Sequence, residues 1–171
     1  MPFDSVPRPV VAYHVEGWSS VLREMVPLWS DHYREVALDK DVVPLSPDFL
    51  RYYGLESEGK LHVVTVRKDG PLVGYLVAIV QTHLHYSTTL FATFDLFYLK
   101  PEERIGWRGV SLFRAAERSL RQRGVTIVQG NTKVHVSPVT GKSLDVGPIM
   151  KFLGWTEVER TYRKRVLPWV L

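Results

Sequence analysis

The stretch that most constrains this chain runs from Phe94 to Gly124, and it predicts a strand, a charged turn and an amphipathic helix in that order. Phe94–Leu99 is short and aromatic, and Lys100-Pro101 follows it. Proline cannot donate a hydrogen bond to a neighbouring strand, so a mostly buried strand is expected to end there. One apolar helical face follows, made by Leu112, Phe113, Ala116 and Leu120. Gly124 is expected to end this helix in the left-handed conformation.

The turn between that strand and that helix is the segment Arg104–Gly109. A turn that opens a helix presents unpaired backbone N–H groups and the positive end of the helix dipole, and together these favour a bound pyrophosphate. Arg104 and Arg108 could add charge-assisted contacts to the same phosphates. A basic loop that only caps a helix is the alternative for so short a motif.

The pattern Leu99-x-Pro101-x-x-Arg104-x-x-Trp107-x-Gly109-x-x-Leu112-Phe113 resembles the acyl-CoA-binding signature of the GNAT superfamily of N-acetyltransferases. That family carries Arg or Gln, then Gly, then Gly or Ala at these spacings. This chain keeps the first and the last, and Trp107 replaces the middle glycine. The resemblance implies acetyl-CoA as co-substrate, no metal, and these cofactor-binding residues: Phe97, Tyr98, Leu99, Arg104, Ile105, Gly106, Trp107, Arg108, Gly109 and Val110.

Length and composition suit one domain over residues 1–171, since 171 residues with 45% apolar content can bury one core. The absence of cysteine excludes disulfides and thiolate metal sites. The sequence has no signal-peptide pattern and no apolar run long enough to cross a bilayer, so we expect a soluble, cytoplasmic protein without a membrane partner. A net charge of +4 suits coenzyme A and a polyanion equally.

The first part of the chain predicts a strand followed by two helices. The strand is Val10–Val15, and apolar residues then recur at helical spacing from Trp18 onward. Pro27 is expected to kink or split that helix. The segment Ser46-Pro47-Asp48 predicts the start of the second helix, with serine as N-cap and proline at the first helical position.

The middle of the chain predicts an antiparallel meander of three strands. Leu61–Lys68 and Leu72–Gln81 are rich in β-branched residues, and the hairpin dipeptide Asp69-Gly70 separates them. A second turn is expected at Tyr86–Thr89, leading into a strand over Leu90–Leu99.

After Gly124 we expect Val125–Val128 as a strand parallel to the one before the turn, because a strand–helix–strand unit has that geometry. A long loop, Gly130–Gly141, follows. A short fourth helix around Ile149–Leu153 is then expected to end at Gly154, and Thr156–Val166 is expected to be a final, cationic strand.

This order of elements resembles GNAT proteins over nearly the whole chain. It implies an α/β (α+β) fold with a mixed central sheet of six to seven strands and about four helices. The antiparallel meander would be followed by the parallel strand–helix–strand unit. In the family, the two parallel strands splay apart and the pantetheine arm enters the opening.

Acetyl transfer to an amine requires a base for the amine, a donor that stabilises the oxyanion, and a proton for the departing thiolate. Asp95 is the only carboxylate within the apolar strand, and strict alternation would place it on the face of Thr93, Phe97 and Leu99. It is our candidate base, acting through water. A structural carboxylate is the competing interpretation, although burying one mid-strand without a purpose is costly.

The proton donor is less evident, because the family often has a tyrosine in the fourth helix where this chain has Met150. Tyr98 is the candidate acid by residue type, and Tyr162, His83 and His85 are alternatives on the same ground. In the family the region of the first two helices helps choose the acceptor, so the candidates for the acceptor site are Trp29, Tyr33, His83 and His85. The competing interpretation, which we favour for most of the aromatic residues in these helices, is that they belong to the core. His83 and His85 lack a third ligand nearby in sequence, so we expect no metal there.

The resulting hypothesis is an N-acetyltransferase that moves an acetyl group from acetyl-CoA to a primary amine by direct attack in a ternary complex. The acceptor remains open among a small amine, an amino acid, an antibiotic and a protein amine, and a homodimer is compatible with this hypothesis. The alternative is a GNAT-like protein without catalysis that senses coenzyme A or binds nucleic acid, which Trp107 and Met150 favour. A third possibility is a different acyl donor.

Overall fold

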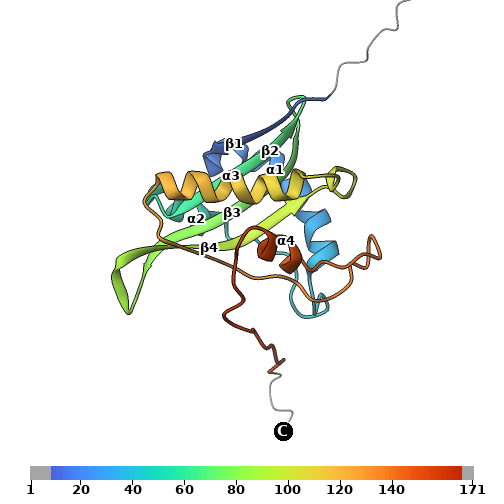
Figure 1. Ribbon diagram of the computed structural model, residues 1–171. Helices are drawn as coiled ribbons and strands as arrows, with labels where there is room; N and C mark the ends of the chain where they lie inside the picture. The colour runs from blue at the N-terminus through green and yellow to red at the C-terminus, as the bar shows by residue number, and fades with distance from the viewer. Residues whose placement is uncertain (1–8, 167–171) are drawn as a thin grey trace, which may run out of the picture.

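A computed structural model describes residues 9–166 of the protein, and these residues form one five-stranded sheet in the order β1-β2-β3-β4-β5. Helices cover both faces of this sheet (Figure 1). The expected α/β fold with about four helices is therefore confirmed, but the expected count of six to seven strands is wrong for the described part of the chain.

Four strands form the antiparallel part: β1 (Val11–Glu16), β2 (Leu61–Lys68), β3 (Leu72–His83) and β4 (Tyr86–Leu99). The predicted turn at Asp69-Gly70 is present, and both residues have positive φ, 52° and 106°. Positive φ at both central residues is what a two-residue hairpin requires, and aspartate and glycine tolerate it best.

The second turn was predicted two residues too late. The strands β3 and β4 are joined at Leu84 and His85, so Tyr86–Thr89 belongs to β4 rather than to the turn. These residues are aromatic or hydroxylic side chains that suit a strand, and they lengthen the hairpin until it projects beyond the body of the sheet (Figure 1).

Two helices cover one face of the sheet. Helix α1 (Trp18–Val36) buries the apolar stripe that the sequence predicted, and it runs through Pro27 without interruption. Because proline has no N–H, the backbone carbonyl of Arg23 lacks its usual helical hydrogen bond from position 27. Both residues are exposed, so water can bond to that carbonyl instead. Helix α2 (Phe49–Ser57) begins two residues later than expected, because its N-cap is Asp48 rather than Ser46. The Asp48 side chain accepts from the Arg51 amide at 3.0 Å.

The other face is covered by α3 (Arg108–Gln122) and α4 (Gly147–Phe152). As predicted, Gly124 follows α3 with φ +81° and Gly154 follows α4 with φ +87°. The short helix η1 (Pro101–Glu103) precedes α3. Strand β5 (Ile127–Gly130) is parallel to β4, two residues later than predicted, because the Val125 amide still bonds to Leu120 at the end of α3.

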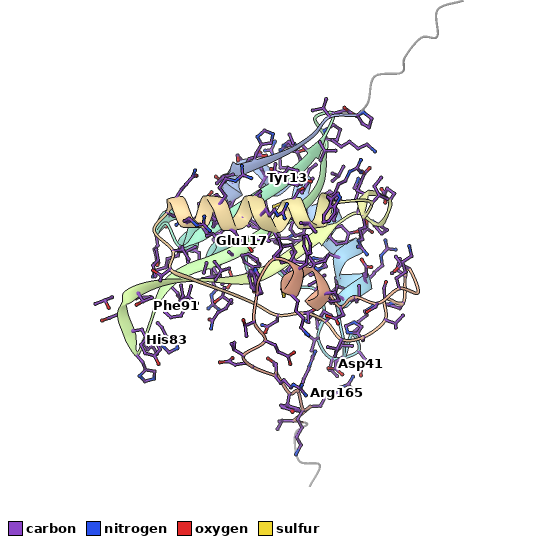
Figure 2. The ribbon with its side chains drawn as sticks, viewed as in Figure 1. Tyr13, Asp41, His83, Phe91, Glu117 and Arg165 are labelled. Carbon is purple, nitrogen blue, oxygen red and sulfur yellow. The ribbon has the colours of Figure 1, made fainter. Side chains whose placement is uncertain are left out.

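The expected final strand, Thr156–Val166, is not a strand in the structure. All of its side chains from Thr156 onward are exposed, and Arg163 and Arg165 pair with Asp39 in the loop after α1 at 2.8 and 2.6 Å. Alternation alone did not distinguish a strand here, because cationic residues interrupt both faces and leave no apolar face to bury against the sheet. Figure 2 shows Arg165 beside Asp41, with which it also pairs.

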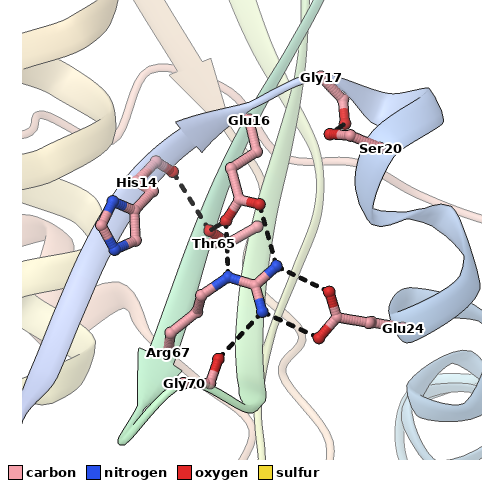
Figure 3. Close-up of polar contacts among 8 residues, drawn as sticks. All are labelled: His14, Glu16, Gly17, Ser20, Glu24, Thr65, Arg67 and Gly70. Carbon is pink, nitrogen blue, oxygen red and sulfur yellow. Dashed lines mark hydrogen bonds and ion pairs between the residues drawn. The ribbon is translucent and has the colours of Figure 1, made fainter.

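An arginine between two glutamates fixes α1 to the sheet (Figure 3). Arg67 in β2 donates to Glu16 in β1 at 2.8 and 2.9 Å and to Glu24 in α1 at 2.9 and 2.8 Å. The paired geometry matches the planar guanidinium to each carboxylate. This cluster of ion pairs sets the position of α1 on the sheet, and the C-terminal end of α1 lines the large cavity of the protein.

Within residues 9–166, no helix is both long enough and apolar enough to cross a membrane.

Candidate functional site

A groove opens where β4 and β5 diverge. The two strands pair only from Phe91 to Phe94 of β4, so among the described residues the β4 edge from Asp95 to Leu99 has no strand beside it. A cavity of about 750 Å³ follows this open edge and reaches the start of α3. The loop after β5 and the end of α1 complete its walls. The splay that the GNAT resemblance implied is therefore present.

A β-bulge at Asp95 changes which way the strand residues face. Ala78 of β3 pairs with Phe94 and Val77 pairs with Leu96, so Asp95 is the extra residue. A bulge places two successive side chains on one side of the sheet and interrupts strict alternation. Phe97 and Leu99 accordingly pack toward α3, and Leu96 packs toward α1.

The prediction that Asp95 shares a face with Phe97 and Leu99 is therefore wrong. Burial raises the pKa of Tyr52 in α2 to about 12, and the neighbouring carboxylate of Asp95, which interacts with the tyrosine hydroxyl, contributes to this rise. Asp95 thus faces the side of the sheet that carries α1 and α2.

The open edge of β4 presents backbone donors to the groove. The Lys100 amide donates to Val73 in β3 at 2.9 Å, and backbone groups of successive residues point to opposite edges of a strand. The N–H groups of Leu99 and Phe97 therefore point to the open edge. The Leu99 carbonyl on this same edge already accepts from Arg104 Nε at 2.7 Å.

The start of α3 supplies a second set of donors. Trp107 is the N-cap and makes no side-chain cap. Within residues 9–166, the amides of Gly106, Trp107, Gly109 and Val110 donate to no protein acceptor. All four residues line the groove. Bare amides and a helix dipole that point into a cavity form a site for an anion.

The side chain of Arg104, by contrast, is engaged with the protein. Its two terminal nitrogens donate to the carboxylate of Glu35 in α1 at 2.6 and 2.5 Å, and its Nε donates to Leu99. Glu35 is 2% exposed, and its hydrogen bonds with Arg104 hold the pKa of the carboxyl below its ordinary value. All three guanidinium nitrogens of Arg104 thus bond to residues of the groove wall, and Arg104 stabilises that wall rather than providing free donors for a phosphate.

Arg108 is likewise paired. It contacts Glu103, which is buried and also accepts from Lys68 Nζ at 2.7 Å. The Arg108 carbonyl accepts from the Tyr13 hydroxyl at 3.2 Å. Main-chain amides are thus the free donors of the turn, whereas both of its arginines neutralise buried carboxylates.

Titratable groups gather on the α1 side of the groove. Burial raises the pKa of Asp95, and hydrogen bonding to Tyr52 opposes this rise. Burial also raises the pKa of Tyr98 and keeps its hydroxyl protonated at neutral pH. Burial lowers the pKa of His32 to about 4, so its ring is neutral at pH 7. His32 stacks on Tyr98 with ring centroids 5.0 Å apart and bonds through Nδ1 to the Tyr75 hydroxyl at 2.9 Å.

The groove brings together most of the residues that the sequence singled out for the coenzyme. Two of them do not line it, Ile105 and Arg108. Those that do are Phe97, Tyr98, Leu99, Arg104, Gly106, Trp107, Gly109 and Val110, together with the candidate base Asp95.

The four residues expected to bind the acceptor do not line this groove. Trp29 is 5% exposed in the core beneath α1, and the Tyr33 hydroxyl donates to Val43 at 2.7 Å. His83 and His85 lie at the tip of the β3–β4 hairpin, where Figure 2 shows His83 away from the body of the protein.

Sequence reasoning missed Glu35, which lies three residues after His32 on the buried face of α1. An acidic residue at an apolar helical position was the signal that could have found it, since such a residue needs a cationic partner. Asn131, Ser143 and Asp145 also line the groove. They come from the irregular segment after β5, where no periodicity indicates direction.

No family model and no curated protein sequence matches the chain. Solved structures do. The ribosomal-protein-alanine N-acetyltransferase of Brucella melitensis biovar Abortus 2308 superposes with a TM-score of 0.64 at 14% identity, over 91% of this chain and 99% of that one. The aminoglycoside N-acetyltransferase AAC(6')-Iy in complex with CoA gives 0.60 at 19% identity, over 95% and 100%. A transcriptional regulator from Bacillus halodurans C-125 gives 0.66 at 18% identity, over 92% and 100%.

The splayed sheet, the groove and these similarities define a class of fold. The chain has the fold of the GNAT N-acetyltransferases, as its turn signature predicted.

Proposed function

We propose that the protein is an N-acetyltransferase that uses acetyl-CoA and a primary amine. One observation supports this proposal most strongly: a single groove contains both the unpaired backbone amides at the start of α3 and the N–H groups along the open edge of β4. Coenzyme A has a diphosphate at one end of a long amide-containing arm, and this groove offers matching partners in the same order.

The diphosphate is assigned to the amides of Gly106, Trp107, Gly109 and Val110. The dipole of α3 favours the negative charge, and the side chains of Arg104 and Arg108 support the loop instead of binding phosphate. The pantetheine arm would add to the open edge of β4 and accept from the N–H groups that point there, in the way that an added strand does.

The thioester would then lie near the bulge at Asp95. The amine nitrogen attacks the thioester carbonyl, and Asp95 takes the amine proton through a water molecule. Its raised pKa makes this carboxylate a stronger base than an exposed aspartate. In this proposal the N–H of Phe97 would stabilise the oxyanion, and the hydroxyl of Tyr98, whose pKa burial raises, would supply the proton for the departing thiolate.

The acceptor side of the site is formed by α1, where His32, Tyr98 and the buried Glu35 meet. We assign no acceptor beyond a primary amine. The similar structures bear the names of enzymes that act on a protein alanine and on aminoglycosides, so both classes belong in a screen.

The test is a thiol-release assay with acetyl-CoA and a panel of amines, peptides and aminoglycosides. The proposal expects release with at least one acceptor and slower release by Asp95→Asn. A melting temperature that millimolar acetyl-CoA leaves unchanged would count against the coenzyme, because a ligand of the folded state must stabilise it.

A second candidate is a coenzyme-binding regulator without catalysis. Met150, where the family often has a tyrosine, is 8% exposed in the core and lies outside the groove lining. The similarity to the Bacillus halodurans regulator favours the same candidate. Coenzyme binding without thiol release for any acceptor, together with salt-dependent binding to DNA, would support it.

A further inference from the structure

The phosphate end of the groove opens onto two exposed aromatic rings. Trp107 is 64% exposed and Phe152 of α4 is 57% exposed, although both are large apolar side chains. Their ring centroids lie 5.4 Å apart with a 40° angle between the planes. Such rings are normally buried, and an exposed pair beside a cavity indicates a surface that binds a ligand.

The position of this pair restricts what the ligand can be. Trp107 itself lines the groove, and its own amide is one of the bare donors at the start of α3. A ligand whose diphosphate occupies those amides therefore places whatever follows the diphosphate against the indole ring.

A cation completes the surface. The guanidinium of Arg114, about two turns along α3 from Trp107, lies 5.9 Å from the centroid of the Phe152 ring. Among the ion pairs and side-chain hydrogen bonds of residues 9–166, none engages Arg114, so it is available for an anionic group next to the rings. Aromatic faces with an adjacent arginine bind nucleobases by stacking and attract their phosphates.

We propose that Trp107 and Phe152 form the purine-binding surface of the coenzyme site, and that Arg114 attracts the phosphate of the nucleotide ribose. This inference rests on the proposed function, because it takes the diphosphate to be that of coenzyme A. It also gives Trp107 a role that a glycine at the same position of the turn cannot have.

The experiment compares two ligands on purified full-length protein by calorimetry. One is coenzyme A, and the other is 4′-phosphopantetheine, which has the same arm and one phosphate but no adenosine. Trp107→Ala should weaken coenzyme A binding about tenfold or more, the usual effect of removing one stacked base, and change phosphopantetheine binding less than about twofold.

Three further variants sharpen the test. Trp107→Phe keeps a ring and should retain most of the affinity, whereas Phe152→Ala should lose part of it. Tyr86→Ala removes an aromatic side chain that is 59% exposed on the distant hairpin and should change nothing. Melting curves without ligand check that each variant folds. Adenosine 3′,5′-bisphosphate alone should quench tryptophan fluorescence in the wild type and not in Trp107→Ala.

The possible results separate the two proposals. If the wild type binds coenzyme A and Trp107→Ala binds it equally well, the purine surface is refuted and the proposed function stands. If both ligands weaken equally, Trp107 only shapes the turn, and the inference is again refuted. If the wild type does not bind coenzyme A, the proposed function fails, and the inference fails with it.

Discussion

The ion pair between Arg104 and Glu35 predicts an asymmetric response to mutation. The Glu35 side chain is 2% exposed and that of Arg104 is 34% exposed. Arg104→Met would leave a carboxylate buried without a partner, and breaking a buried pair in this way costs about 3 kcal/mol or more. Glu35→Gln would leave a guanidinium that still bonds to Leu99 and can reach water, so its cost should be about 1 kcal/mol.

Urea unfolding followed by circular dichroism measures these free energies, and an unchanged slope would show that the denatured states are comparable. The double variant Glu35→Leu/Arg104→Met removes both charges and should be more stable than Arg104→Met alone. Arg121→Met, at an exposed position of α3, is the control and should stay within about 0.5 kcal/mol of wild type. The reasoning is refuted if Arg104→Met costs no more than Glu35→Gln.

Three other predictions concern the strand, the base and pH. Gly74→Ala should lower the free energy of unfolding in urea by about 2 to 3 kcal/mol, because the added Cβ would lie 2.7 Å from the Tyr98 carbonyl oxygen. Gly54→Ala, whose Cβ would meet no atom within 4 Å, should be neutral or stabilising. Equal effects of the two substitutions would contradict this prediction. Asp95→Asn should slow turnover but leave the acetyl-CoA melting shift intact, and normal turnover would show that Asp95 is not the base. Burial lowers the pKa of His32 and of His62 to about 4, so the unfolded chain takes up protons that the folded one cannot. Stability should therefore fall as pH drops from 6.5 toward 4, by about 2 kcal/mol per histidine at pH 5. His62→Asn should halve this slope, and a flat profile would contradict the assignment.

Local signals predicted most of the fold. The strand, turn and helix around Gly106 depend on neighbouring residues: apolar spacing, a proline after the strand, and a glycine with positive φ after the helix. The Asp69-Gly70 hairpin is equally local. These features were predictable because they depend on residues close together in the sequence and not on distant contacts.

Long-range features were not predictable in the same way. The bulge at Asp95 depends on how β4 pairs with β3, and it reversed the predicted orientation of Phe97 and Leu99. The segment Thr156–Val166 alternates like a strand, but it has no apolar face, and its arginines pair with Asp39 instead. Alternating side chains show that a segment is compatible with a strand conformation, but they do not identify a neighbouring strand with which it pairs.

The site was predictable only in part for a related reason. The donors assigned to the coenzyme are main-chain amides, and an amide leaves no mark in residue type. The charges of Arg104 and Arg108 made them candidates for binding the phosphates, yet in the structure they form ion pairs with Glu35 and Glu103. Only Glu35 had a sequence signal that was overlooked, its position on the apolar stripe of α1.

The central claim is that the amides at the start of α3 and along the open edge of β4 bind coenzyme A. Amide chemical shifts of ¹⁵N-labelled protein, followed during a coenzyme A titration, test it residue by residue. We predict that the largest saturable shifts occur at Gly106, Trp107, Gly109 and Val110, with a second set at Phe97 and Leu99. Saturation with coenzyme A while these amides stay unmoved, or binding that shifts only residues elsewhere, would contradict the account.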